Sequence, residues 1–321
     1  MTGIICGTGS YTPSYVMDNN EIATMVETND EWIKERTGVA ARHIIKDETT
    51  VSMACEAAKR ALADGQVDAG EVDLIIVSTI SSNIILPCTA CEVQKELGAK
   101  GATCFDLSAA CSGFVLAYNT ALAYLFGGVY KTALIIGSES LSNLTNWEDR
   151  STCILFGDGA GAAVMKAGEG RTYLPVTYSD GMKGKALTCS SRHALADTCR
   201  MKDPEYYIQM DGQAVFKFAV KKVPEAVSEV LEKNHVEKEE ITWYILHQAN
   251  RRIVEAVAKR LDEPMEKFPM NLQEYGNTSS ASIAILLDEM KKDKRLKSGQ
   301  KIVIAGFGAG LTWGASIIEW G

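Results

Sequence analysis

The chain has 321 residues, of which 46% are hydrophobic and 23% are charged. This composition is that of a folded globular protein and excludes a disordered, collagen-like or coiled-coil chain. The length suits one large domain or two fused ones, and the net charge of −8 argues against a nucleic-acid partner, because phosphate binding depends on dense lysine and arginine.

Strands and helices alternate along the chain. Helical periodicity covers residues 21–26, 53–63 and 223–233, and β-branched apolar runs predict buried strands at 74–79 and 133–137. This alternation predicts an α/β fold. The loop-like segment 166–172 lies between two halves, so we expect an N-terminal half of residues 1–168 and a C-terminal half of residues 169–321.

The two halves resemble each other in sequence. Residues 73–78 align with 242–247; Cys111 follows Ser78 by 33 residues, and Asn277 follows His247 by 30. A helix of small residues and then a glycine cluster come after each. We interpret this pattern as a duplicated α/β unit, whose pseudo-twofold axis would place Cys111 and Asn277 at equivalent positions with His247 nearby.

No stretch approaches the length of apolar chain that crosses a bilayer, and residues 1–10 lack the basic and then apolar order of a secretory signal. We therefore expect a cytoplasmic protein without a membrane partner. Nine cysteines, scattered from Cys6 to Cys199, are then expected to be thiols rather than a disulfide framework.

Cys111 is the strongest candidate nucleophile. It lies in Asp106-Leu-Ser-Ala-Ala-Cys-Ser-Gly-Phe114, at the start of a largely apolar helix. Unpaired backbone N–H groups and the positive end of the helix dipole favour the thiolate, which is the reactive form. The alternative is a buried cysteine that acts as a small hydrophobic residue.

His247 and Asn277 are the candidate partners of this thiol. His247 is the one of four histidines that a hydrophobic strand would deliver inward, as an acid, a base or a hydrogen-bond donor. Asn277 precedes a helix, and an N-cap role would explain it completely. Beside a histidine and a thiolate, its amide could instead polarise a carbonyl.

Two glycine clusters and a cysteine pair give weaker signals. Residues 157–162 fit a dinucleotide-binding pattern, but the run after them is too short for the helix that such a site requires. Residues 306–310 predict a tight loop between strands, whose N–H groups could face a site. Cys88 and Cys91 mimic a zinc or redox pair, but no second pair exists, so we expect structural cysteines and no metal.

Taken together, these residues resemble the thiolase-fold condensing enzymes, and most closely the 3-oxoacyl-(acyl-carrier-protein) synthase III family. The resemblance covers essentially the whole chain. It rests on six motifs in family-like order: Asn29-Asp-Glu-Trp-Ile-Lys-Glu-Arg-Thr-Gly38, Ser108-Ala-Ala-Cys-Ser-Gly-Phe114, Asp149-Arg-Ser-Thr-Cys-Ile-Leu-Phe-Gly-Asp-Gly-Ala-Gly161, His247-Gln-Ala-Asn250, Gly276-Asn-Thr-Ser279 and Gly306-Phe-Gly-Ala-Gly-Leu-Thr-Trp-Gly314. It implies a thiolase-like fold in which two pseudo-twofold-related βαβαβαββ halves form five layers, αβαβα.

The resemblance also implies an activity, that of the initiating condensing enzyme of type II fatty acid biosynthesis. Cys111 would accept the acyl group of an acyl-CoA, with acetyl-CoA as the expected starter. Malonyl-acyl-carrier protein would then lose carbon dioxide, and its carbanion would attack the acyl-cysteine. His247 and Asn277 would stabilise the enolate, and the backbone N–H groups of Cys111 and Ala309 would form a second oxyanion hole. The mechanism requires no metal or redox cofactor.

Three binding surfaces follow from the same resemblance. Trp32 and Arg150 would sandwich the adenine of CoA, with Arg36 near its phosphates. Without the family, Trp32 would be a half-buried helix anchor and Arg150 the partner of a neighbouring carboxylate. The acidic carrier protein would meet Gln248 and four basic residues that share helical faces in pairs: Lys217, Lys221, Arg252 and Lys259.

The third surface is the acyl pocket of a homodimer. Phe307 would line it, together with Leu86 from the partner subunit. Leu86 stands where relatives often have phenylalanine, and a leucine would leave a differently shaped cavity. We therefore expect acetyl to be accepted, and somewhat longer or branched starters as well.

Other functions remain open on the sequence. A hydroxymethylglutaryl-CoA synthase would need a carboxylate near the nucleophile, and residues 78–82 offer none. A hydrolase with cysteine, histidine and asparagine could pass the acyl group to water. A related CoA-dependent condensing enzyme could serve a specialised pathway. A thiol-rich metal or redox binder centred on Cys88 and Cys91 is the non-enzymatic alternative.

Overall fold

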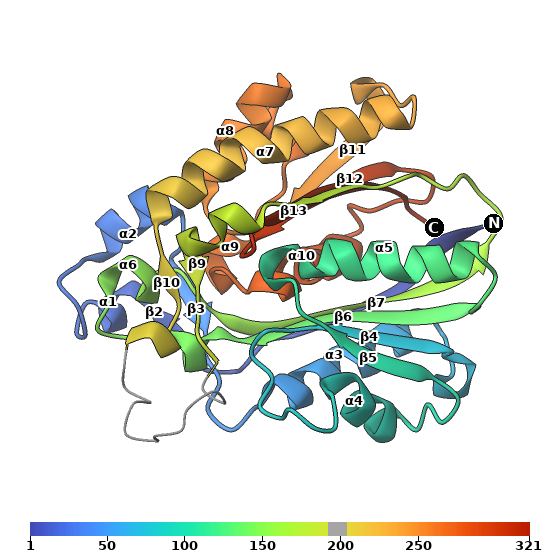
Figure 1. Ribbon diagram of the computed structural model, residues 1–321, viewed down its shortest axis with the longest axis horizontal. Helices are drawn as coiled ribbons and strands as arrows, with labels where there is room; N and C mark the ends of the chain where they lie inside the picture. The colour runs from blue at the N-terminus through green and yellow to red at the C-terminus, as the bar shows by residue number, and fades with distance from the viewer. Residues whose placement is uncertain (192–203) are drawn as a thin grey trace.

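The protein folds into five layers that alternate helices and sheets (Figure 1). The computed structural model describes residues 1–191 and 204–321. Helices α3 (Thr50–Asp64) and α4 (Thr89–Leu97) cover the outer face of a five-stranded sheet. Helices α7 (Gly212–Lys233) and α8 (Arg251–Leu261) cover the outer face of a four-stranded sheet. Helices α5 and α10 lie between the two sheets. The α/β class and the αβαβα layering expected from the sequence are thus confirmed.

The first sheet has the strand order β1-β7-β6-β4-β5. β4, β5 and β6 are parallel, whereas β7 runs antiparallel to both β6 and β1. β4 and β6 are buried along their whole length, as central strands covered on both faces must be. The strands are β1 (Thr2–Tyr11), β4 (Leu74–Ser78), β5 (Thr103–Leu107), β6 (Thr132–Ser140) and β7 (Asp158–Gly168).

The second sheet repeats this topology in the order β11-β12-β13-β8. Its parallel pair, β11 and β12, matches β4 and β6; the antiparallel β13 and β8 match β7 and β1. These strands are β8 (Val176–Ser179), β11 (Ile241–Leu246), β12 (Lys301–Gly308) and β13 (Thr312–Glu319). Two short ladders flank the sheets: β2 (Val16–Asp18) with β3 (Ala41–His43), and β9 (Leu187–Thr188) with β10 (Gln209–Met210).

The helices follow the predicted periodicity, except that the first helical stretch is shorter than expected. They are α1 (Asn19–Ile22), α2 (Asp30–Thr37), α3 (Thr50–Asp64), α4 (Thr89–Leu97), α5 (Gly113–Phe126), α6 (Arg150–Cys153), α7 (Gly212–Lys233), α8 (Arg251–Leu261), α9 (Leu272–Tyr275) and α10 (Ser282–Lys292). Within the described ranges, none of them has both the length and the apolar character that a membrane span needs.

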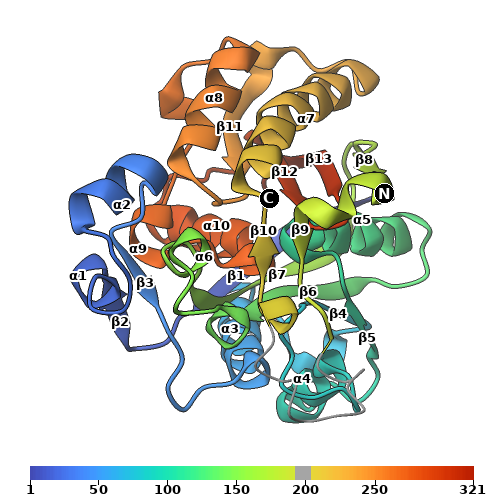
Figure 2. The ribbon, with the colours of Figure 1, turned by 60° about the vertical axis from the view of Figure 1, so that its left-hand side comes forward.

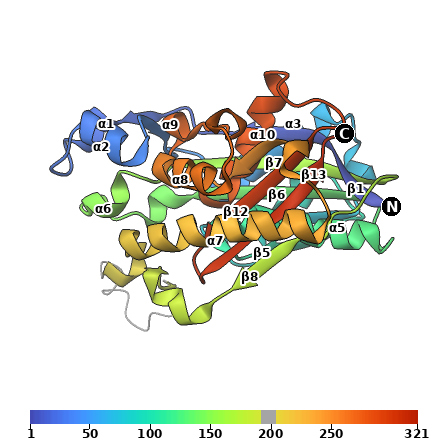
Figure 3. The ribbon, with the colours of Figure 1, turned by 90° about the horizontal axis from the view of Figure 1, so that it is seen from above.

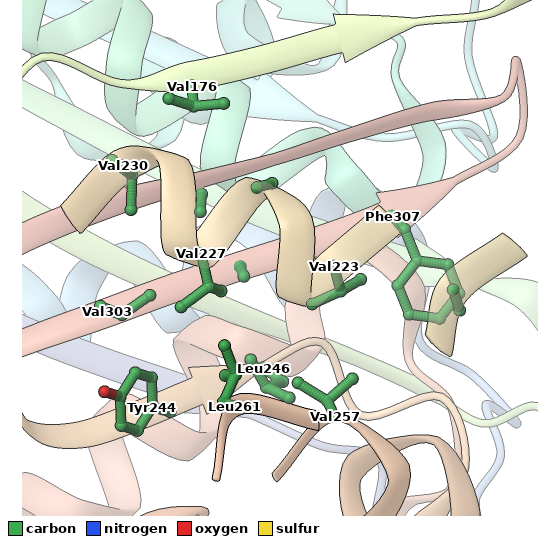
Figure 4. Close-up of a cluster of buried hydrophobic side chains, with 14 of the residues drawn as sticks. Val176, Val223, Val227, Val230, Tyr244, Leu246, Val257, Leu261, Val303 and Phe307 are labelled. Atoms are coloured by element: carbon green, nitrogen blue, oxygen red, sulfur yellow. The ribbon is translucent and has the colours of Figure 1, made fainter. Parts of the chain in front are cut away.

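A valine stripe on α7 holds the outer helices to the second sheet. Val223, Val227 and Val230 recur at helical spacing, so they share one face of the helix. Figure 4 shows this face turned toward Val303 of β12, with Phe307 at one end of the cluster. Seen from above, α7 lies across β12 and β13 (Figure 3).

Both middle-layer helices begin with a 3₁₀ turn: η2 (Ala110–Ser112) precedes α5, and η10 (Ser279–Ala281) precedes α10. The first residue of each turn is left-handed, with φ of 46° at Ala110 and 48° at Ser279. The turns therefore match residue for residue, and Cys111 corresponds to Ser280. The predicted equivalence of Cys111 with Asn277 is wrong, because Asn277 lies two residues before its turn begins.

Each turn packs on a glycine in the sheet of the other half. A Cβ at Gly137 of β6 would lie 2.3 Å from the carbonyl oxygen of Ser280, and a Cβ at Gly306 of β12 would lie 3.3 Å from that of Cys111. Gly137 and Gly306 are each the sixth residue of their strand. The halves thus interlock through reciprocal contacts that leave little space for a side chain.

We expect Gly137→Ala to lower the free energy of unfolding by about 1–3 kcal/mol, because the new methyl group must displace the backbone of η10. Urea unfolding followed by circular dichroism measures the change. Gly101→Ala is the matched control, since a Cβ there meets nothing within 4 Å, and its effect should stay within about 0.5 kcal/mol. Equal effects of the two substitutions would contradict the close approach.

Candidate active site

A cavity of about 180 Å³ lies where the two halves meet, and Cys111, His247 and Asn277 all line it. Cys111 comes from η2, His247 follows β11, and Asn277 precedes η10. The structure therefore brings together three side chains that are far apart in the sequence. Most of the other lining residues are apolar, which suits an acyl chain.

The Cys111 thiol is partly buried at the start of the middle layer. Burial raises the pKa of this thiol to about 12, although an interaction with Ser279 acts in the opposite direction. The expectation that the helix start favours the thiolate is therefore wrong for the resting protein. Loss of hydration opposes the helix dipole here and favours the protonated thiol in the substrate-free protein.

The His247 ring is neutral and held on one side. Only 2% of the residue is exposed, and burial lowers the pKa of the imidazole to about 3. Its Nδ1 lies 2.7 Å from the hydroxyl oxygen of Ser282, and its backbone N–H donates to the carbonyl of Ala305. Phe307 meets the ring edge to face, with centroids 5.5 Å apart. A neutral imidazole can donate one hydrogen bond into the cavity.

Asn277 is fixed by both its backbone and its side chain. Its N–H donates to Leu155, and its carbonyl accepts from Gly157, which ties the residue to the N-terminal half. Its Oδ1 accepts the N–H of Ser279 at 2.9 Å. The side chain thus has the cap-like contact that the sequence suggested. Because Oδ1 is occupied, the Nδ2 group is the end that remains to donate into the cavity.

Sequence reasoning missed three polar residues beside these groups. Ser279 lines the cavity, and its buried hydroxyl lies near Cys111 without a hydrogen bond of normal geometry to any described residue. Ser282 contacts His247. Both belong to the run Thr278-Ser-Ser-Ala-Ser282. A cluster of hydroxyl residues at the start of a helix with an apolar face is a signal that could have found them, since buried hydroxyls need partners.

The third missed residue is Glu139, near the end of β6. Its carboxylate is buried and accepts hydrogen bonds from the hydroxyls of Ser81 and Ser280, at 2.5 and 3.0 Å, and from the N–H of Ile80, at 3.1 Å. Burial raises the pKa of Glu139 despite these donors. A carboxylate thus lies close to residues 78–82, but it faces the serines and is not among the residues that line the cavity.

The remaining pocket residues divide into two groups. Phe307 and Ala309 line the cavity, and Gly308 between them lies so close that a Cβ there would be 2.7 Å from the Cys111 nitrogen. Leu86 lies outside the cavity of its own chain and is 84% exposed. The neighbouring Ile85 is 58% exposed, so the loop presents apolar side chains to the outside.

Trp32, Arg36 and Arg150 come together on the surface. The guanidinium carbons of Arg150 and Arg36 lie 5.0 and 5.6 Å from the centroid of the Trp32 ring. Arg150 donates to the carbonyl of Glu27, and within the described residues it forms no ion pair. Asn250, which lines the cavity, donates to the carbonyl of Arg36 and so connects this surface to the cavity. Helices α2 and α8 lie side by side here (Figure 2).

The predicted carrier-protein residues fall into two classes. Four basic side chains are exposed on α7 and α8, and none forms an ion pair within the residues described: Lys217, Lys221, Arg252 and Lys259. Arg252 lies 5.9 Å from the ring of Phe216, which lines the cavity. Gln248 is a correction. It is only 1% exposed, and its side chain bonds to the backbone of Leu246 and Asn271, so it cannot meet a partner.

The glycine cluster at residues 157–162 and the pair Cys88 and Cys91 belong to the structural framework of the fold. Gly157 precedes β7 and not a helix, so it does not open a nucleotide-binding turn. Cys88 caps α4, and its sulfur lies 3.5 Å from that of Cys91. No disulfide bond joins two cysteines within the described ranges, and no group of side chains there is arranged to hold a metal ion. Cys199 lies outside the described residues.

Comparison with known proteins agrees with this geometry. Family models described as 3-oxoacyl-[acyl-carrier-protein (ACP)] synthase III match residues 105–181, and the C-terminal model of the same family matches residues 231–320. The beta-ketoacyl-[acyl-carrier-protein] synthase III of Clostridium botulinum (strain Loch Maree) is 46% identical over 320 residues, which cover 98% of each chain.

Solved structures give the same result. The crystal structure of 3-oxoacyl-[acyl-carrier-protein] synthase III from Aquifex aeolicus is 44% identical with a TM-score of 0.93, covering 99% of this chain and 100% of its own. The priming beta-ketosynthase of the R1128 polyketide pathway is 34% identical with a TM-score of 0.93, covering 99% and 96%. This chain belongs to the 3-oxoacyl-[acyl-carrier-protein] synthase III family.

Proposed function

We propose that this protein is the initiating condensing enzyme of type II fatty acid biosynthesis. It would join an acyl-CoA starter, with acetyl-CoA expected, to malonyl-acyl-carrier protein and release CoA and carbon dioxide. The observation that carries this proposal is the convergence of Cys111, His247 and Asn277 on one apolar cavity, in a chain of this family. We place the activity in the cytoplasm, without a metal or redox cofactor.

Acyl transfer to Cys111 is the first half-reaction. The sulfur attacks the thioester carbonyl, and the carbonyl oxygen becomes negatively charged between the backbone N–H groups of Cys111 and Ala309. Because burial keeps the thiol protonated, its proton must leave as the new bond forms. The departing CoA sulfur takes up a proton, so the products are acyl-Cys111 and free CoA.

Decarboxylation is the second half-reaction. When malonyl-carrier protein loses carbon dioxide, negative charge moves to its thioester oxygen as an enolate. A neutral His247 and the Nδ2 group of Asn277 would each donate a hydrogen bond to that oxygen. The enolate carbon then attacks acyl-Cys111, and the released sulfur regains a proton.

The binding surfaces are proposed on contacts within this chain. Arg150 and Arg36 flank Trp32, so an adenine could insert between the indole and a guanidinium, with the other arginine near phosphate. Exposed Lys217, Lys221, Arg252 and Lys259 would attract the acidic carrier protein, although the chain as a whole is negative.

We also propose that the protein is a homodimer and that each subunit consists of two halves, residues 1–168 and 169–321. An exposed apolar loop supports the dimer, because Leu86 is 84% exposed and Ile85 58%. In that dimer Leu86 would reach the acyl pocket of the partner, where Phe307 lies.

Two other activities share the same residues. A condensing enzyme of a specialised pathway is favoured by the 34% identity to a priming ketosynthase of polyketide biosynthesis. A hydrolase would use Cys111 in the same way but pass the acyl group to water. The product distinguishes the hydrolase, because only a condensing enzyme forms a 3-oxoacyl-carrier protein.

The two half-reactions can be tested separately. The protein, mixed with acetyl-CoA and malonyl-carrier protein, should form acetoacetyl-carrier protein, and Cys111→Ser should form none. Asn277→Ala should still acylate Cys111 but should condense about 10² to 10³ times more slowly, because one enolate donor is lost. Intact-protein mass spectrometry measures both steps. Free acetate without a condensed product would favour the hydrolase.

Docking of the carrier protein on the exposed basic residues can be tested by charge reversal. Reversing the charge of two proposed docking residues with Lys217→Glu and Arg252→Glu should raise KM for malonyl-carrier protein about tenfold, or about 1.4 kcal/mol, with little change in kcat. Lys100→Glu, an exposed lysine on the first half, makes the same charge change elsewhere and should leave KM unaltered. A similar KM increase from both positions would argue against a local docking face.

The range of acyl-CoA starters that the protein accepts can be tested by acylation of Cys111. Single-turnover acylation of Cys111 should proceed with acetyl-, butyryl- and isobutyryl-CoA, because Leu86 leaves more room than an aromatic ring. Leu86→Phe should slow the two larger starters about tenfold and leave acetyl-CoA within about threefold, as a change of a few methylene volumes in an apolar pocket allows. Strict preference for acetyl-CoA in the unmodified protein would refute this expectation.

A further inference from the structure

Ser282, the first residue of α10, lies directly behind the imidazole of His247. Its hydroxyl oxygen is 2.7 Å from Nδ1 of the ring, and it also accepts the backbone N–H of Gln248 at 3.3 Å. The side chain is buried, with 2% of the residue exposed. A hydroxyl that is so buried is expected to find its hydrogen-bond partners within the protein.

The proton on this hydroxyl has one acceptor. A serine hydroxyl carries a single proton and two lone pairs, and the N–H of Gln248 already occupies one lone pair. Among the residues that the structure describes, Nδ1 of His247 is the acceptor within reach. If Nδ1 carried the proton instead, the oxygen would accept twice and its own buried proton would be left without a partner, which is unfavourable.

This arrangement determines the state of the other ring nitrogen. When Nδ1 accepts from Ser282, a neutral imidazole must carry its proton on Nε2. His247 lines the cavity, and no described residue bonds to Nε2. The ring therefore presents an N–H donor to the cavity and not a lone pair. Enolate stabilisation needs a donor.

The serine is specific to the half that carries the histidine. The matching 3₁₀ turns make Gly113 of α5 the counterpart of Ser282 in α10. A Cβ at Gly113 would lie 1.8 Å from the hydroxyl oxygen of Ser78, so no side chain fits there. The hydroxyl behind His247 is thus not a general feature of the duplicated unit.

We propose that Ser282 is a positioning residue that fixes His247 in the Nε2–H tautomer and holds its ring toward the cavity. The role in turnover rests on the proposed function, whereas the tautomer itself does not. In the reaction, Ser282 touches no substrate. It acts through the imidazole. Without it, the ring would be free to rotate, or its proton could move from Nε2 to Nδ1.

Nitrogen NMR of the substrate-free protein tests the tautomer directly. In ¹⁵N-histidine-labelled protein, with His247→Gln to assign the signals, the long-range ¹H–¹⁵N pattern should show the proton on Nε2 and a hydrogen-bonded, unprotonated Nδ1. In Ser282→Ala, the Nδ1 signal should move toward that of a ring nitrogen without a hydrogen bond. Ser282→Thr keeps the hydroxyl and should restore the original signal.

Kinetics test the role in turnover. Ser282→Ala should slow condensation about 10- to 100-fold, the usual effect of losing a residue that orients an active imidazole, while acylation of Cys111 stays within about threefold. Ser316→Ala is the matched control, because Ser316 is also 2% exposed but bonds to Asn119 away from the histidine. It should change neither the rates nor the His247 signals.

Two outcomes would overturn the proposal. One is a proton on Nδ1 in the unmodified protein, and the other is an Nδ1 signal that Ser282→Ala leaves unchanged. A protein that shows the expected NMR pattern but makes no condensed product would keep the tautomer assignment and would refute the condensing activity instead.

Discussion

Reciprocal packing of two 3₁₀ turns on two glycines is the constraint on which the rest of the structure depends. Gly137 of β6 receives the backbone of Ser280, and Gly306 of β12 receives that of Cys111. Because each half supplies one turn and one glycine, neither half can complete the arrangement alone. The first residues of the turns, Ala110 and Ser279, have a left-handed backbone conformation, which is unfavourable for residues other than glycine. The packing stabilises them in this conformation. The cavity lies where these contacts bring the halves together.

The same repeated framework has been used differently on its two sides. On the Cys111 side, the eighth residue of β12 is Gly308, which packs closely on the backbone of Cys111 and lines the cavity. On the Ser280 side, the eighth residue of β6 is Glu139, whose buried carboxylate accepts hydrogen bonds from Ser81, Ser280 and Ile80. One side is therefore open to a substrate, and the other is a closed polar network that anchors η10. That turn and the start of α10 then orient both proposed donors, through Ser279 at Asn277 and Ser282 at His247.

Sequence patterns predicted the α/β class, the duplication and three candidate side chains for one site, because strand periodicity and the match of 73–78 with 242–247 can be read from the sequence. The five-layered arrangement followed from the resemblance to the condensing enzymes. The patterns did not predict correctly which residues of the two halves correspond to each other. The left-handed start at Ser279 shifts the match, so that Ser280, and not Asn277, corresponds to Cys111. Nor could they reveal the thiol's raised pKa or the burial of Gln248, since both depend on how much water the folded chain excludes. Glu139 escaped notice because its partners lie on other strands and turns, and pairing between segments distant in the chain leaves no local pattern.

Phe307 belongs both to the cavity wall and to the apolar cluster under α7, whereas Leu86 belongs to neither (Figure 4). Exchanging Phe307 for a smaller residue would open the pocket and remove core packing in one step, so natural variants there must offset a loss of several kcal/mol. Leu86 carries no such burden in its own fold. In the proposed dimer, substitutions at Leu86 can therefore change which acyl chain lengths the partner's pocket accepts. The stability of the fold that carries the catalytic residues would stay the same.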